Sequence, residues 1–73
     1  MKRFNNDKMR AQRVLMKFTQ EELASKTNLS VFTISRIESG AAENLRLETL
    51  YSIAKALFLD PEDLLMEEEE ANE

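Results

Sequence analysis

Apolar residues in this 73-residue chain recur at intervals of three and four, which is the spacing that one face of an α-helix requires. Met9 and Met16 share such a face, with Arg13 between them. Asp60 followed by Pro61 is typical of a helix start, because proline is tolerated at the first helical position. The pattern predicts an all-α domain of five helices, at about residues 7–17, 20–27, 31–39, 47–57 and 61–66.

Residues with turn and capping chemistry separate these helices. Thr19 and Glu22 match the capping box, in which each side chain bonds the backbone amide of the other residue. Asn28 stands where the chain must turn, and asparagine tolerates a left-handed backbone. We expect Ser30 to cap the third helix and Gly40 to end it.

The composition restricts the chemistry. The chain has no Cys and no His, which excludes disulfides and the common zinc ligand sets. It also lacks a glycine-rich phosphate loop, so we expect neither an enzyme nor a bound metal or cofactor. The apolar runs are too short to cross a membrane and the first residues do not form a secretory signal, so we expect a cytoplasmic protein.

The net charge of −4 is unevenly distributed along the chain. Residues 60–73 carry eight acids and no base, whereas residues 1–59 carry ten bases against six acids. We interpret residues 1–66 as one folded domain and residues 67–73 as a disordered acidic tail. The basic body is compatible with a nucleic-acid partner, although solvated helix faces would show the same charges.

The twenty residues from Gln20 have the spacing of two short helices that cross steeply. Ala24 supplies the small residue that the crossing needs, and Asn28 supplies the turn. The inward positions are Leu23, Thr27, Leu29, Ile34 and Ile37. Because these positions bury one side only, the opposite side of the second helix is free to enter a DNA groove.

Further blocks follow the same order along the chain. The matching blocks are Thr19-Gln20-x-Glu22-Leu23-Ala24, Leu29-Ser30, Ile34-Ser35-x-Ile37-Glu38-x-Gly40, Thr49-Leu50, Ile53-Ala54-x-Ala56-Leu57 and Asp60-Pro61-x-x-Leu64. Together they resemble the helix-turn-helix family of the phage lambda, 434 and Cro repressors, also called XRE-like. The resemblance covers about residues 8–66 and departs from the family at Leu45 and Arg46, where a proline and a small capping residue are usual.

The resemblance implies a sequence-specific regulator of transcription, a repressor or an autoregulator, that binds double-stranded DNA. It places base contacts on the outer side of the third helix, at Val31, Phe32, Thr33, Ser35 and Arg36. It implies phosphate contacts from Gln20, Lys17, Ser30 and Arg46. Val31 and Phe32 cannot donate hydrogen bonds, so in a groove they would favour thymine methyl groups. The alternatives are that Phe32 packs on neighbouring helices and that Arg36 pairs with a glutamate.

The same family pairs an arginine of the first helix with a glutamate at the end of the third. The resemblance therefore implies a partly buried salt bridge between Arg13 and Glu38, with a structural role.

Apolar residues also gather in the last part of the domain, at Phe58, Leu59, Leu65 and Met66. A chain of this size cannot easily bury them all, so we expect a homodimer face, with satellite core packing as the alternative. A second class of function stays open, in which the chain is an antitoxin or adaptor that acts mainly through protein binding. In that case the acidic tail could bind a basic partner such as a toxin.

Overall fold

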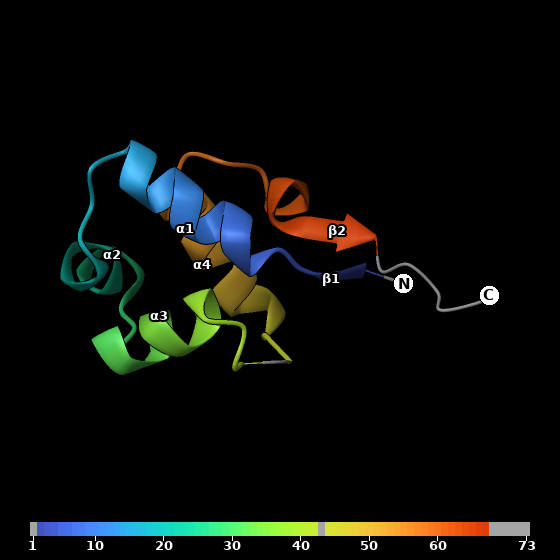
Figure 1. The fold of residues 1–73 in the computed structure, drawn as a ribbon, viewed down its shortest axis with the longest axis horizontal. Coiled ribbons are helices and arrows are strands. Elements are labelled where there is room, and N and C mark those ends of the chain that lie inside the picture. Colours follow the sequence, from blue (N-terminus) through green and yellow to red (C-terminus); the bar gives the residue numbers. More distant parts are fainter. Residues whose placement is uncertain (1, 43, 68–73) are drawn as a thin grey trace.

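The computed structural model describes residues 2–42 and 44–67, which fold into a small, mainly helical domain (Figure 1). None of the described helices is long and apolar enough to cross a membrane. The elements follow the order β1 (Lys2–Phe4), α1 (Asn6–Leu15), α2 (Gln20–Thr27), α3 (Val31–Glu38), α4 (Leu47–Ala56), the 3₁₀ helix η1 (Pro61–Leu64) and β2 (Leu65–Glu67).

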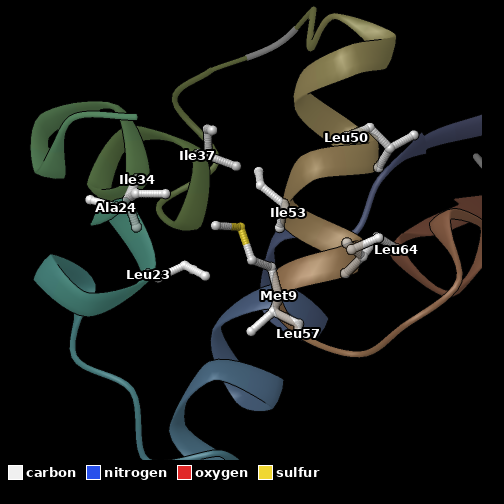
Figure 2. Close-up of a cluster of buried hydrophobic side chains, with 10 residues drawn as sticks. Met9, Leu23, Ala24, Ile34, Ile37, Leu50, Ile53, Leu57 and Leu64 are labelled. Atoms are coloured by element: carbon white, nitrogen blue, oxygen red, sulfur yellow. The ribbon is translucent and has the colours of Figure 1, made fainter. Parts of the chain in front are cut away.

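All four α-helices and η1 contribute to one apolar core (Figure 2). Met9 of α1 lies at its centre, between Leu23 of α2 and Ile53 of α4. The remaining buried apolar residues are Ala24, Ile34, Ile37, Leu50, Ala54, Leu57 and Leu64. The inward positions predicted for α3 are therefore confirmed, and they hold that helix against the domain by one side only.

The helix starts follow the predicted capping chemistry. The Glu22 amide donates to Thr19 Oγ1 at 3.0 Å and the Thr19 amide donates to Glu22 Oε1 at 2.8 Å, which completes the capping box of α2. Ser30 Oγ accepts from the Thr33 amide at 3.0 Å and caps α3. The first helix begins slightly earlier than predicted, because Asn5 caps it by accepting from the Lys8 amide.

Each of the four α-helices ends in the same left-handed turn. The residue with positive φ is Lys17 (62°), Asn28 (63°), Gly40 (84°) or Phe58 (60°). In the turn after α4, the Phe58 amide donates to Lys55 O at 3.2 Å and the Leu59 amide donates to Ala54 O at 2.8 Å. This pair of bonds is the Schellman motif, whose left-handed position is most often glycine. Gly40 and Asn28 fit that preference, whereas Lys17 and Phe58 do not.

The expected all-α fold of five helices is correct only in part. Pro61 and the bond from the Asp60 amide to Asp63 Oδ2, at 2.9 Å, begin a helical segment as predicted. That segment is a single 3₁₀ turn that ends at Leu64, whose side chain is buried in the core. Leu65 then adopts an extended backbone and enters strand β2 instead of continuing a helix.

Strands β1 and β2 form a two-stranded antiparallel sheet that joins the two ends of the described chain (Figure 1). Lys2 pairs with Glu67 and Phe4 with Leu65, and the Asn5 amide donates to Leu64 O at 2.7 Å. The sheet takes the place of residues 65–66, the last part of the short C-terminal helix that the sequence pattern predicts. Glu67, the first residue of the predicted acidic tail, lies in this sheet, and the rest of that prediction falls on residues 68–73, outside the described residues.

Candidate nucleic-acid interface

Helix α3 has a buried side and an exposed side. Ile34, Ile37 and Glu38 are buried against the domain. Five residues are the predicted base contacts: exposed Val31, Phe32, Ser35 and Arg36, and half-buried Thr33. Phe32 is 71% exposed, so it is not packed on neighbouring helices in the free protein. The structure thus brings all five residues to one helix and leaves four of them accessible to a partner.

The Arg36 guanidinium is only weakly held. Its Cζ lies 5.8 Å from the centroid of the Phe32 ring, which is the outer limit of a cation–π contact. Its Nη2 donates to Ala41 O across 3.4 Å, which is long for a hydrogen bond. No ion pair links Arg36 to a described carboxylate. The fork of this side chain can therefore reach a base or a phosphate at little cost.

Ser30 and Thr33 are already hydrogen-bonded to each other. The Ser30 hydroxyl donates to Thr33 Oγ1 at 3.0 Å and accepts from the Thr33 amide. Thr33 Oγ1 accepts in this bond, so its own hydrogen remains available to donate, whereas a contact that needs Ser30 as a donor must compete with Thr33.

Glu38 is the centre of a polar network behind the exposed side of α3. Its carboxylate receives Arg13 Nε at 2.6 Å, Arg13 Nη2 at 3.1 Å and Gln20 Nε2 at 3.1 Å. Asn6 Nδ2 donates to the Glu38 carbonyl at 3.0 Å, and Arg13 Nη1 donates to Phe18 O at 2.8 Å. The side chains of Arg13 and Glu38 are only 13% and 3% exposed, so this ion pair joins α1 to α3 in the domain interior.

Gln20 also belongs to that network, through a contact with Glu38 that the sequence pattern did not predict. The side chain is half-buried at the first position of α2, where the opening amides of a helix lack internal partners. One hydrogen of its amide group bonds Glu38, and the other is available to an anion. Glu38 therefore fixes the side chain of the residue that the resemblance places against a phosphate.

The remaining predicted phosphate residues lie on turns. Lys17 is exposed in the left-handed turn between α1 and α2. Arg46 is exposed at the start of α4 and makes only a 3.8 Å contact with Glu48, which is also exposed. Within residues 2–42 and 44–67, no cluster of acidic residues is arranged to hold a metal ion.

The four residues predicted for a homodimer face do not form one exposed surface. Leu59 and Leu65 are half-buried and pack against the core, and Met66 is half-buried in β2. Phe58 is 78% exposed. It follows Leu57, whose carbonyl accepts from Gln12 Nε2 at 3.1 Å, so it neighbours the end of α1.

A family model described as helix-turn-helix matches residues 9–64 of the chain. The restriction-modification controller protein C.AhdI from Aeromonas hydrophila is 27% identical, with 81% of this chain and 88% of that chain covered and a TM-score of 0.76. The P22 c2 repressor, in complex with a synthetic operator, is 30% identical, with 84% and 91% covered and a TM-score of 0.77. SinR in complex with DNA, at 20% identity and a TM-score of 0.76 with 81% and 97% covered, shares the fold. No curated protein matches the chain in sequence.

Proposed function

The chain belongs to the helix-turn-helix family of lambda-type, XRE-like repressors, and from this premise we propose that it regulates transcription by binding specific sites on double-stranded DNA. The observation that carries the proposal is the exposed side of α3, which presents an arginine, an aromatic ring and two hydroxyl groups on a helix held by its buried side. A helix of this kind fits the major groove, where each base pair shows a distinct pattern of donors and acceptors.

Base recognition in this proposal divides between polar and apolar contacts. Arg36 reads guanine through O6 and N7, since its fork matches those two acceptors. Phe32 and Val31 contact thymine methyl groups. Ser35 and Thr33 hydrogen-bond to base edges or to the backbone beside them. The specificity of the site would then be set mainly by one arginine and two apolar residues.

Phosphate contacts would fix the register of α3 on the duplex. Gln20 and the first amides of α2 bind one phosphate, which also suits the positive end of that helix. Lys17, Ser30 and Arg46 contribute further contacts on either side. These interactions position the protein without reading sequence.

We propose that the protein binds a two-fold operator as a homodimer, because one helix-turn-helix covers about half a site. The predicted interface residues are Phe58, Leu59, Leu65 and Met66, of which Phe58 is the most exposed. Analytical ultracentrifugation that shows only monomer, with and without operator, would remove the homodimer and leave DNA binding by a single copy.

The test of DNA binding is selection from a random duplex library, followed by binding measured over a series of salt concentrations. Arg36→Ala should relax specificity at one base pair by about 1–3 kcal/mol. Lys17→Ala should weaken all sequences alike and make the salt dependence shallower. Lys55→Ala is the matched control, because it removes an exposed base of α4 that is outside the proposed interface. Binding with neither a sequence preference nor a salt dependence would overturn the proposal.

A further inference from the structure

The nitrogen end of the Gln20 side-chain amide faces Glu38. Gln20 Nε2 donates to Glu38 Oε1 at 3.1 Å. An ionised carboxylate accepts hydrogen bonds and donates none, so the carbonyl end of the amide group cannot take this position. The second hydrogen on Nε2 has no acceptor among residues 2–42 and 44–67. The contact therefore orients a half-buried side chain at the start of α2 and leaves it one unused donor.

Two backbone donors lie beside this side chain. The capping box of α2 uses the amides of Thr19 and Glu22, which donate at 2.8 and 3.0 Å. The amides of Gln20 and Glu21, between them, have no hydrogen-bond partner in the described part of the chain. The turn thus offers three donors to a phosphate, but it carries two acids and no base. A phosphate contact here depends on donors that are correctly aimed, since the local charge does not favour it.

The charge of Glu38 is balanced on its other side by Arg13. Arg13 Nε donates to Glu38 Oε2 at 2.6 Å, and Arg13 Nη2 donates to Oε1 at 3.1 Å. Arg13 Nη1 donates to Phe18 O at 2.8 Å, which holds the guanidinium in place. A carboxylate paired in this way offers Gln20 a fixed acceptor, and it repels a nearby phosphate much less than an unpaired carboxylate would.

We propose that Glu38 is a positioning residue for DNA binding, so that the Arg13–Glu38 pair has a second role besides joining α1 to α3. The proposal rests on the proposed function, in which Gln20 binds a DNA phosphate. Glu38 itself does not touch the DNA. It holds the Gln20 amide so that an N–H group, and not the carbonyl oxygen, meets the phosphate. Because this orientation exists before DNA arrives, binding loses less side-chain entropy.

Glu38→Gln tests the orientation, because it keeps the size of the side chain and removes its charge. A neutral amide at this position can donate as well as accept, so it no longer selects the nitrogen end of Gln20. In part of the molecules the Gln20 carbonyl oxygen would then face the phosphate. The affinity for the selected DNA should fall about tenfold, the value of one hydrogen bond to a charged acceptor.

Replacement of single phosphates by uncharged methylphosphonate shows where the affinity is lost. The phosphate bound by Gln20 is the one whose replacement weakens the natural protein more than it weakens Gln20→Ala. At that phosphate alone, Glu38→Gln should be less sensitive to the replacement than the natural protein. Phe4→Ala is the matched control, because it removes a ring of β1 that packs against the core, and it should keep the natural profile.

A double variant separates positioning from a general loss of folding. Protein concentrations are corrected for the folded fraction measured by circular dichroism. If Glu38 acts through Gln20, Glu38→Gln should weaken DNA binding by Gln20→Ala less than about twofold. Equal weakening of the natural protein and of Gln20→Ala would overturn the proposal, and so would an unchanged methylphosphonate profile in Glu38→Gln.

Nuclear magnetic resonance of the natural chain tests the orientation even if Glu38→Gln does not fold. The two Nε2 hydrogens of Gln20 are assigned by the loss of their signals in Gln20→Ala. Their shifts should differ from those of an unstructured glutamine in the free protein. They should change further on the selected duplex, but not on the duplex with methylphosphonate at the Gln20 phosphate. Shifts of an unstructured glutamine in the free protein would overturn the proposal.

The two proposals can fail separately. Failure to select any preferred DNA sequence would count against the proposed regulator. A preferred duplex that Glu38→Gln binds with the natural methylphosphonate profile would count against the positioning role alone.

Discussion

Replacing Arg13 with methionine removes the cation from the interior network while keeping most of the apolar volume of the side chain. The carboxylate of Glu38, 3% exposed, would then keep only the bond from Gln20 Nε2, at 3.1 Å. An ionised group that is buried with so little compensation is strongly unfavourable. The variant should therefore lose much of its stability.

The magnitude follows from the burial of the two partners. Removal of one member of a buried pair costs about 3–5 kcal/mol, against a total of about 4–11 kcal/mol for a domain of this length. Glu38→Gln should cost less, about 2–3 kcal/mol, because the guanidinium left behind is 13% exposed and still donates to Phe18 O at 2.8 Å. The double variant Arg13→Met with Glu38→Leu should recover to within about 1–2 kcal/mol of the natural chain, since no charge stays buried.

Urea denaturation followed by circular dichroism, at one fixed protein concentration, measures these differences. For a domain of this size a loss of 3–5 kcal/mol corresponds to a fall in Tm of about 12–40 °C. The reasoning is refuted if Arg13→Met costs less than about 1 kcal/mol, the value of an exposed pair. It is also refuted if Glu38→Gln costs more than Arg13→Met, because the order rests on which group is more deeply buried.

Three further changes test other features. Thr19→Ala removes the bond to the Glu22 amide and should cost about 1 kcal/mol, read as a lower Tm. Lys17→Gly relieves a left-handed residue and should raise stability by about 1 kcal/mol, yet weaken DNA binding; a fall in Tm would show that the turn is not strained. Phe4→Ala removes a half-buried ring from β1 and should cost about 1–2 kcal/mol in a urea titration, whereas no change would mean that the sheet adds nothing to stability.

The local chemistry of the sequence was sufficient to predict much of the helical framework. The capping pair Thr19 and Glu22, the serine cap at Ser30, and the turns at Asn28 and Gly40 each depend on neighbours within a few residues. Such contacts can be read from spacing alone. The inward side of α3 was predicted for the same reason.

The parts that were missed depend on residues far apart in the sequence. Strand β1 has three residues, too few to show an alternating pattern, and its partner is at the other end of the chain. Leu65 and Met66 follow a helix start signal, so the sequence pattern predicts that they continue a helix. In the structure they pair with β1 and form a strand instead. The hydrogen bond from Gln20 to Glu38 joins α2 to α3, and no sequence pattern within either helix predicts it.

The left-handed turns at Lys17 and Phe58 were missed for a different reason. Neither residue type favours positive φ, so no local signal marked these positions. In both turns, backbone amides after the helix donate to carbonyls in the last turn of α1 or α4. This bonding pattern places Lys17 and Phe58 at positive φ, whatever the preference of their side chains. The sequence analysis expected Phe58 at a homodimer face, and its spacing gave no indication of the left-handed backbone at this position.

The sheet between β1 and β2 also determines the order in which the domain assembles and opens. The turn from α2 to α3 closes over a few residues, whereas Lys2 meets Glu67 only after nearly the whole chain has been brought together. Loop closure over that length is entropically costly and is offset by only a few residue pairs, so the sheet should form after the helices and separate before them. Its amides should exchange with solvent fastest among the ordered elements, and the helix-turn-helix should persist when the ends of the domain have already opened.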